Sequence, residues 1–369
     1  MLPYLLLLLI SLCFCFCAVQ IDKKGIRLHV GDHEYVKTHN LALPVFFLLL
    51  FALVACRAMS VGNDTLNYAY MFHTARKASL DAILHLDEEV LYHLLNWIVG
   101  RFTTDAQWLF ATVAALTLIP MALLYCGDRK HSILKIVLFV NMSTFVMLFS
   151  GIRQSLAIAV GILAYFCARN KKPLWFVVSV LIAMGVHHSA FVLFLMYPLY
   201  RVRIKRIHLL LVVPAMGGVY LFNNAIFTFL TEVFDTYSDK YITETSETGA
   251  YAMLVLFILF AVLAFILPDE EKLDGQTAGL RNLMLLAVTL QCFAPVHHLA
   301  MRMNYYYIIF IPLLIPRIID AASDRWRIMA RYVTAVFCLF FVGYFVMDLV
   351  ASLETGGVLH TVPYVPFWR

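Results

Sequence analysis

ILKIVLFVNMSTFVMLFSGIRQSLAIAVGILAYFCA, residues 133–168, contains two long apolar runs that meet at Gly151 and Ile152. Each run approaches the roughly 20 residues that a helix needs to cross the hydrocarbon core of a bilayer. Neither run alternates between polar and apolar positions as a barrel strand does, so helices must satisfy the backbone. The stretch therefore predicts two membrane helices, 133–150 and 153–168, joined by a very tight turn.

The whole chain has the same apolar character. Hydrophobic residues make up 62% of its 369 residues and charged residues 14%, against roughly 45–50% and 25% in soluble domains. A soluble fold cannot bury that much apolar surface under a polar exterior, and the mean hydropathy of +0.82 agrees. The composition predicts a polytopic membrane protein and, despite a net charge of +5, no nucleic acid partner.

Twelve apolar segments predict an all-α, polytopic integral membrane helical bundle that forms a single transmembrane domain over residues 1–369. The segments are 3–20, 41–59, 105–126, 133–150, 153–168, 174–186, 188–200, 207–222, 250–267, 282–300, 303–319 and 330–350. Residues 4–19 are similar to the apolar core of a signal peptide. Because no positive region precedes them and no cleavage pattern follows, we interpret them as the first membrane segment.

The positions of Lys and Arg predict the orientation of these segments. Twenty of the 28 basic residues fall in 21–40, 127–135, 169–173, 201–206, 268–281 and 317–331. The positive-inside rule makes these segments cytoplasmic. Both termini and the loops 60–104 and 223–249 then lie outside.

Three apolar segments in this topology are shorter than a typical membrane span. The basic clusters that flank 174–200 should share the cytoplasmic face, which predicts a hairpin of 174–186 and 188–200 with His187 and His188 at its tip. The apolar run 90–102 in the first outer loop suits an interfacial or re-entrant helix.

Several familiar catalytic motifs are absent from the sequence. The eight cysteines lie in or at the ends of apolar runs without a CxxC pair, and predict neither disulfides nor a metal site. No Gly-rich phosphate loop, HExxH or DxD sequence occurs, which disfavours ATP-driven work and nucleotide-sugar chemistry. We therefore expect no cofactor and no metal, and any chemistry must come from the membrane helices and their loops.

Two arginines on the predicted outer side contradict the orientation signal. Arg153 has no acidic neighbour in sequence, and Arg302 precedes a run of three tyrosines that begins at Tyr305. A guanidinium can grip a phosphate through two parallel hydrogen bonds. Alternatively, both side chains reach the outer lipid headgroups, and the tyrosines form an interfacial aromatic belt.

Two histidine pairs lie at predicted outer helix ends. His187 and His188 precede Ser189 between two apolar half-segments. Imidazole can act as a base near neutral pH or, when protonated, bind a phosphate; equally, the pair makes a hairpin tip polar. For His297 and His298, the interfacial interpretation is favoured.

The first outer loop supplies carboxylates. Asp64 and Thr65 can cap a helix, and Asp87 to Glu89 suit the start of the apolar helix that follows. Alternatively, these carboxylates provide a general base opposite a phosphate-binding wall.

Taken in order along the chain, these features resemble the EpsG family, which are Wzy-like polymerases of bacterial exopolysaccharide and capsule. The matching positions are Gly62, Asp64 and Tyr68; Glu89, Leu91, Tyr92 and Asn96; Arg153 to Ala157; His187, Ser189 and Ala190; and Arg302 with Tyr305. The resemblance covers roughly residues 40–320, with 153–200 as its most specific part. The first 35 residues and the C-terminal tail carry no recognisable motif.

The resemblance implies an inverting, metal-independent membrane glycosyltransferase with a GT-C-like architecture. Its site would face the exterior or periplasm from the bacterial cytoplasmic membrane, where it would join oligosaccharide repeat units carried on undecaprenyl diphosphate. Its partners would be this lipid-linked substrate, membrane lipids, a flippase and chain-length regulators.

The resemblance also implies roles for individual residues. The diphosphate would contact Arg153, Arg302, Gln154 and His188; the base for the acceptor hydroxyl would be His187, Asp64 or Glu89; and the sugar would contact Tyr68 and Tyr305. His188 doubles the single histidine of the family, so which ring acts stays open.

Four other interpretations share part of this pattern. A flippase for the same lipid needs cations reachable from both faces and commonly has repeated halves. A membrane O-acyltransferase is also built around an intramembrane histidine. A ligase differs from a polymerase mainly in its acceptor. The fourth alternative is a structural membrane subunit without chemistry.

Overall fold

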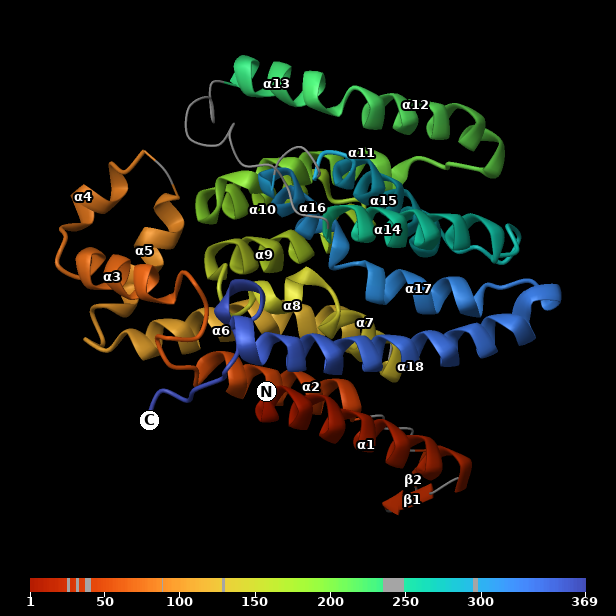
Figure 1. Cartoon of the computed structure of the whole chain (residues 1–369), viewed down its shortest axis with the longest axis horizontal. Helices are drawn as coiled ribbons and strands as arrows, with labels where there is room; N and C mark the ends of the chain where they lie inside the picture. The colour runs from red at the N-terminus through yellow and green to blue at the C-terminus, as the bar shows by residue number, and fades with distance from the viewer. Residues whose placement is uncertain are drawn as a thin grey trace. The chain divides into compact units, whose positions relative to one another are not determined.

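Figure 1 shows the computed structural model of the chain, which is built almost entirely from helices. The structure describes residues 1–24, 27–30, 33–36, 41–87, 89–127, 130–234, 249–294 and 298–369, without the side chains of 17–40, 230–250, 295–300 and 358. The described residues form two compact units. One consists of Met1–Ile162, Ile182–His188 and Thr334–Arg369, and the other of Leu163–Leu181 and Ser189–Val333.

The first unit contains the N-terminal half of the chain and its C-terminal end. Its elements are α1 (Leu2–Lys24), β1 (Arg27–Val30), β2 (His33–Val36), α2 (Ala42–Ala55), α3 (Thr65–Ala75), α4 (Leu80–Leu84), α5 (Val90–Val99), α6 (Ala106–Cys126), α7 (Ser132–Val140), α8 (Ser143–Met147), the start of α9 (Ile152–Arg169), the end of α10 (Pro173–Val186), most of α18 (Asp324–Thr355) and the 3-10 helix η3 (Val358–His360). Helix α2 packs against α1 and α6, and α5 packs against α3 and α4 (Figure 1).

The second unit is formed by the middle of the chain. Its elements are the 3-10 helix η1 (His188–Leu195), which begins at the unit boundary, α11 (Met196–Arg201), the 3-10 helix η2 (Arg206–His208), α12 (Leu209–Leu221), α13 (Asn223–Phe234), α14 (Gly249–Ile266), α15 (Gly275–Gln291), α16 (His298–Ile308) and α17 (Ile311–Asp320). Helix α15 packs against α11, α14, α16 and α17 and forms the centre of this unit.

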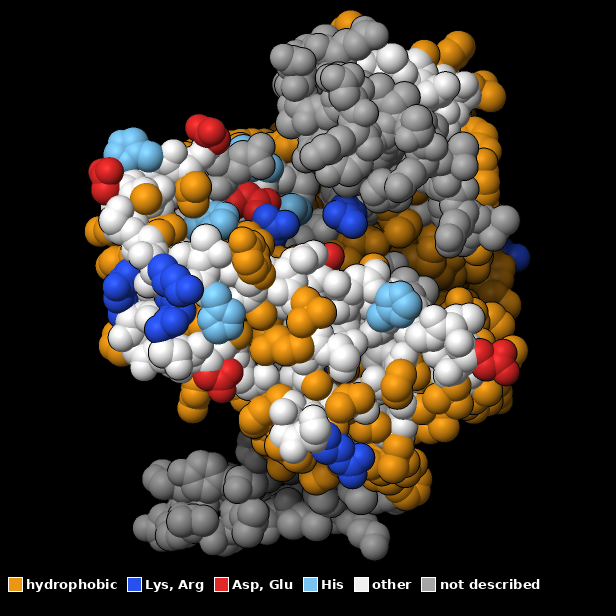
Figure 2. Space-filling view, turned by 60° about the vertical axis from the view of Figure 1, so that its left-hand side comes forward, with side chains coloured by type: hydrophobic (Ala, Val, Ile, Leu, Met, Phe, Trp, Pro, Cys, Tyr) orange, Lys and Arg blue, Asp and Glu red, His pale blue; other side chains and the backbone are white. Residues whose placement is uncertain are grey.

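Among the described residues, three helices are long and apolar enough to cross a membrane. These are Ala106–Cys126, Ile152–Arg169 and Asp324–Thr355, and a pair bent by 75°, Arg206–Leu221 with Asn223–Phe229, makes a fourth if it counts as one span. Large apolar side chains of α18 are openly exposed, for example Leu339 at 74% and Met347 at 72%. Figure 2 shows apolar side chains gathered toward the right-hand side of the view, beside a face that carries charged and other polar side chains. Apolar surface on this scale requires lipid around it, so the chain is a helical membrane protein.

Two segments that were predicted as single membrane helices are each divided into two helices in the structure. The segment 133–150 is interrupted between α7 and α8, where the Asn141 amide donates a hydrogen bond to the Val137 carbonyl at 2.8 Å and competes with the backbone pattern. The segment 303–319 is interrupted between α16 and α17. Pro312 lies in the first turn of α17 and has no N–H with which to continue the preceding helix.

The segment predicted at 282–300 is displaced toward the N-terminus. Helix α15 begins at Gly275, where the Asp274 side chain accepts a capping hydrogen bond. Because of the charge of Arg281, the sequence predicted that this part of the chain lies in the cytoplasmic segment 268–281. In the structure Arg281 is buried, and its guanidinium donates to Glu270 at 2.8 Å and to the Ile204 carbonyl at 2.7 Å. An arginine that is paired with a carboxylate is tolerated inside an apolar helix. The sequence pattern alone could not show that Arg281 has such a partner.

Two other predicted boundaries also differ. The helix break after Val186 agrees with the sequence, but residues 188–200 form a 3-10 helix and the short α11, which has Pro198 in its first turn. The predicted cytoplasmic segment 21–40 contains the end of α1 and an antiparallel hairpin in which Arg27 lies opposite Val36.

The C-terminal tail is anchored to the loop that follows α2. Gly62 N–H donates to the His360 carbonyl at 2.9 Å and Asn63 N–H to the Leu359 carbonyl at 3.0 Å. Gly62 has φ +95°, and a Cβ there would lie 2.2 Å from the Phe149 carbonyl oxygen, so only glycine fits. The tail thereby fixes the loop from which α3 begins (Figure 1). It also contacts α1, where the Tyr4 hydroxyl donates to the Thr361 carbonyl at 2.7 Å.

Candidate active site

Glu89 immediately precedes α5 in the first unit and is only 8% exposed. Its backbone has φ 51° and ψ 35°, the left-handed region that residues with a side chain seldom adopt. Glu89 thus begins α5, as the sequence predicted, but its carboxylate accepts no capping hydrogen bond from that helix. Strained backbone of this kind is commonly found where a side chain must be aimed at a functional site.

The Glu89 carboxylate binds a cation and a histidine at the same time. Oε2 accepts a hydrogen bond from Nη1 of Arg153, and Oε1 lies 2.5 Å from Nδ1 of His187. Arg153 lies in the first turn of α9, and His187 directly follows α10. Three segments that are far apart in sequence therefore meet at one carboxylate. The Arg153 and His187 side chains keep 31% and 20% of their surface exposed, so a ligand can reach them.

Two buried tyrosines support Arg153. Its Cζ lies 5.6 Å from the ring centre of Tyr68 and 6.0 Å from that of Tyr92, and the two rings are 6.0 Å apart. Cations are attracted to aromatic ring faces at these distances. The hydrogen bond to Glu89 comes from Nη1, and Nε has no hydrogen-bond partner among the described residues. The guanidinium is thus held in place and still has an N–H group without a hydrogen-bond partner in the described part of the chain.

The pKa of Glu89 is lowered by its partners. Burial on its own raises the pKa of this carboxyl, but the hydrogen bond from His187 and the charges of His187 and Arg153 outweigh burial. Glu89 is therefore ionised at neutral pH. An ionised carboxylate only accepts hydrogen bonds, so Nδ1 of His187 must carry the hydrogen. In the neutral ring the other nitrogen, Nε2, is then the proton acceptor.

This lowered pKa predicts how stability depends on pH. A carboxyl with a lower pKa in the folded chain binds fewer protons there than in the unfolded chain. Its contribution is complete above the unfolded value of about 4.3 and disappears as the pH falls through the folded value. At pH 7 we expect Glu89→Gln to be less stable than the natural protein by about 1–3 kcal/mol.

The measurement is thermal unfolding of both proteins in detergent between pH 7 and pH 3. The gap between their midpoints should close as the pH falls below about 4.3. An equal gap at both ends of the range would show that the ionised carboxylate does not contribute in this way.

Three other candidate residues lie in the same unit. Asp64 is partly buried next to α3, but its side chain makes no capping hydrogen bond. Gln154 follows Arg153 in α9 and is 3% exposed, whereas His188 is exposed at the start of η1. His187 and His188 are thus distinguished by geometry, since the Glu89 carboxylate contacts His187.

The remaining candidates belong to the second unit or lie outside the described residues. Arg302 is exposed and Tyr305 is 5% exposed, both on α16. His297, the side chain of His298, Glu88 and most of the predicted outer loop 223–249 fall outside the described residues.

A further charged residue of the first unit, Arg57, is not among the predicted site residues. Arg57 follows α2 and is fully buried. The signal was present, because Arg57 lies inside the apolar segment 41–59, and an ionisable residue within such a segment is a functional candidate by default.

The fold and this cluster of carboxylate, guanidinium and imidazole define a helical membrane protein with a candidate active site. Residues 40–364 match the EpsG family, so the chain belongs to the EpsG family. The match confirms the resemblance and extends past residue 320 into the C-terminal tail, in which no motif was recognised. No curated protein and no solved structure matches the chain.

Proposed function

We propose that this protein is a polysaccharide polymerase that joins undecaprenyl-diphosphate-linked oligosaccharide repeat units. Membership of the EpsG family supports a polymerase-like function. The observation that carries the proposal is the Glu89 carboxylate bound to both Arg153 and His187. This arrangement keeps a phosphate-binding cation and a base side by side, as transfer from a lipid diphosphate requires.

In the proposed reaction, an acceptor hydroxyl attacks the anomeric carbon of the donor chain. The new glycosidic C–O bond forms as the bond from that carbon to the diphosphate oxygen breaks, and the configuration inverts. Nε2 of His187 takes the hydroxyl proton, and Glu89 stabilises the resulting imidazolium. Arg153 stabilises the negative charge of the leaving undecaprenyl diphosphate. Neither a metal nor a cofactor takes part.

The family resemblance implies roles for the other candidates. In the first unit, Gln154 and His188 would contact the diphosphate, Asp64 would bind the acceptor sugar and Tyr68 would contact a sugar ring. In the second unit, Arg302 would contact the diphosphate and Tyr305 a sugar ring. We further propose twelve membrane segments in a GT-C-like arrangement within the bacterial cytoplasmic membrane, with the site facing outward. The positive-inside distribution of Lys and Arg supports this orientation.

The test is reconstitution of the whole protein in liposomes with undecaprenyl-diphosphate-linked oligosaccharide. We expect longer glycan chains, detected by mass spectrometry, with one undecaprenyl diphosphate released for each repeat unit joined, and no loss of activity on addition of a chelator. Translocation of the lipid without elongation would instead establish a flippase. Transfer to an unrelated acceptor without elongation would establish a ligase.

A further inference from the structure

Helix α3 turns one face toward the candidate active site and the other toward solvent. Tyr68 and Phe72 are buried on the inner face, where Tyr68 supports Arg153. On the other face, Leu66 is exposed, and so are four polar or aromatic side chains at helical spacing: Asn67, Tyr70, His73 and Thr74. Tyr70 is 73% exposed. A helix that lies in lipid exposes mainly aliphatic side chains, so this polar face of α3 is turned to water.

Three basic side chains lie at the end of the polar face. Arg76 and Lys77 directly follow α3, and Arg101 follows α5 after Gly100. Gly100 lets the two helix ends approach, because a Cβ there would lie 2.4 Å from that of Arg76. The Arg101 guanidinium donates to the Arg76 carbonyl at 3.3 Å and stacks 4.3 Å from the ring centre of Trp97. We call these three cations the outer basic cluster, and Figure 2 shows basic side chains gathered at the left-hand edge of the view.

The outer basic cluster has no counter-charge of its own. Among the described residues, no carboxylate forms an ion pair with it. The acidic residues nearest in sequence have other partners, since Asp81 lies 3.4 Å from a histidine nitrogen and Asp105 caps α6. Lys77 and Arg101 are exposed, and the buried Nε of Arg76 makes no hydrogen bond within the described chain. Unpaired positive charges on a water-facing surface attract an anionic partner.

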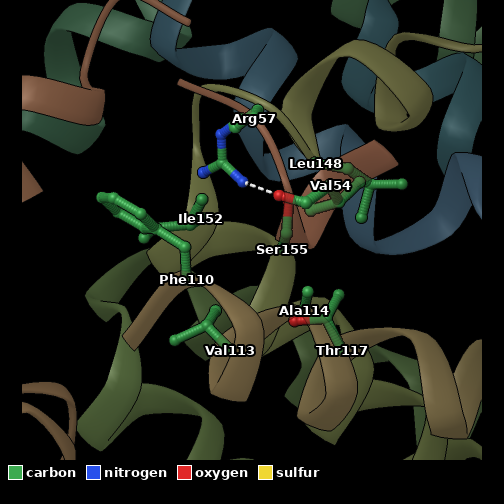
Figure 3. A pocket seen from close by; sticks show the side chains of 9 residues that line it. All are labelled: Val54, Arg57, Phe110, Val113, Ala114, Thr117, Leu148, Ile152 and Ser155. Carbon is green, nitrogen blue, oxygen red and sulfur yellow. Dashed lines mark hydrogen bonds between the residues drawn. The ribbon is translucent and has the colours of Figure 1, made fainter. Parts of the chain in front are cut away.

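Arg57 also lacks an ion pair among the described residues, but no large ligand can reach it. It is fully buried, and its Nη1 donates to the Val54 carbonyl at 2.5 Å (Figure 3). The cavity next to it has a volume of about 10 Å³, which is room for no more than one water molecule. The accessible positive charge is therefore that of the outer basic cluster.

We propose that the polar face of α3 and the outer basic cluster bind the growing polysaccharide chain, and that this chain is acidic, with carboxylate or phosphate groups on its sugars. The inference rests on the proposed polymerase function and specifies the class of its substrate. Tyr70 stacks on a sugar ring, and the outer basic cluster binds the acidic groups. From Tyr68 to Lys77 the chain advances about 14 Å along the helix axis. A glycan whose reacting end lies at the active site thus extends along α3 to the cations.

The test is isothermal titration calorimetry of the whole purified protein in an uncharged detergent with two probes. One is an oligogalacturonate, which carries one carboxylate per sugar, and the other is its fully methyl-esterified form, which has the same chain without the charge. We expect the acidic probe to bind about tenfold or more tightly at low salt, and the difference to shrink as salt is added. Equal affinities, or binding of neither probe, would overturn the proposal.

Variants locate the binding surface. Lys77→Gln and Arg101→Gln should each weaken binding of the acidic probe about threefold and leave the neutral probe unchanged. Tyr70→Ala removes a stacking surface and no charge, so it should weaken binding of both probes about fivefold. The matched control is Lys172→Gln, which removes an exposed cation from the predicted cytoplasmic segment 169–173 and should retain the natural affinity. An equal loss in Lys172→Gln and Lys77→Gln would contradict the proposal, because total charge would then attract the probe.

Anionic lipid headgroups are the competing occupant of the outer basic cluster. They are tested by thermal unfolding in phosphatidylcholine nanodiscs with and without phosphatidylglycerol. A stabilisation by phosphatidylglycerol that Lys77→Gln and Arg101→Gln abolish, without any preference for the acidic probe, would assign the cluster to lipid and exclude the glycan.

The binding measurement needs no chain elongation, so failure of this inference and failure of the proposed function are distinguishable. Elongation by a protein that binds both probes equally would exclude only the acidic substrate. A preference for the acidic probe in a protein that does not elongate glycans would contradict only the polymerase function.

Discussion

Replacing His187 with alanine is expected to lower the rate of chain elongation by about 10²–10⁴-fold, the usual contribution of a positioned general base. The Glu89 carboxylate fixes the hydrogen of His187 on Nδ1, so Nε2 is the nitrogen that accepts the proton of the acceptor hydroxyl. Without the ring, the proton acceptor that Glu89 orients is lost, and the Glu89 carboxylate itself remains bound to Arg153. The measurement is the initial rate of elongation by protein reconstituted in liposomes, with membrane insertion checked separately.

His188→Ala is the control for this prediction. The two rings are adjacent in sequence, but His188 is exposed, whereas His187 contacts the Glu89 carboxylate. If His188 only contacts the diphosphate, its removal should raise KM more than it lowers kcat. A His188→Ala variant that loses kcat as severely as His187→Ala, or a fully active His187→Ala variant, would contradict the assignment of His187 as the base.

The second large effect is expected for Glu89→Gln, which should lower kcat by about 10²-fold or more. The amide preserves the shape of the side chain and can still accept from Nδ1 of His187. It removes the charge that stabilises the imidazolium, and its NH₂ group is a donor where Arg153 also presents donors. Because Arg153 is then released to bind diphosphate, KM should stay the same or fall. Loss of kcat without a rise in KM separates positioning of the base from simple loss of substrate binding.

Asp87→Asn is the matched control for this change. Asp87 lies two residues before Glu89 and is exposed, so neutralising it removes one negative charge from the same loop without altering the site. Its kcat should remain within about twofold of the natural value, since surface substitutions away from a site have small effects. An equal loss in both variants would indicate that the charge of the loop matters, and not the contact with His187.

The sequence was sufficient to predict the helical membrane class and the family, because both rest on patterns local to the chain. Apolar runs determine where helices form, and the residues around Arg153 and His187 stand in the order typical of the family. The polar positions within these runs, Arg153, His187 and Glu89, are the residues that the structure brings together.

The pairing of these residues was beyond sequence reasoning. Arg153 has no acidic neighbour in sequence, and its partner Glu89 is 64 residues away. The sequence also explained Glu89 as a residue that begins α5, which it does. Only the structure shows that its carboxylate contacts Arg153 and His187 instead of capping that helix. Local sequence patterns indicate where helices begin and end. They do not indicate which distant side chain forms an ion pair with a charged residue.

The predicted helix boundaries were wrong where a charged residue has a hydrogen-bond partner from a different part of the chain. Arg281 and its partner Glu270 belong to α15 and the turn before it, and Arg281 was assigned to a cytoplasmic loop because its charge looked incompatible with a helix in a membrane. Arg57 shows the opposite error. It was absorbed into an apolar run and overlooked, although it is one of the largest fully buried side chains.

The anchoring of the C-terminal tail has a consequence for biosynthesis. The backbone of Gly62 and Asn63 is held by the carbonyls of His360 and Leu359, and Ala58 by that of Val365. A ribosome adds about 5–20 residues per second, so the loop before α3 is made long before its partners exist. The loop next to the Glu89 cluster therefore reaches its final conformation only after residues 359–365 have been synthesised and have folded back onto it. The order of synthesis thus places the folding of this loop after that of the helices between the two segments.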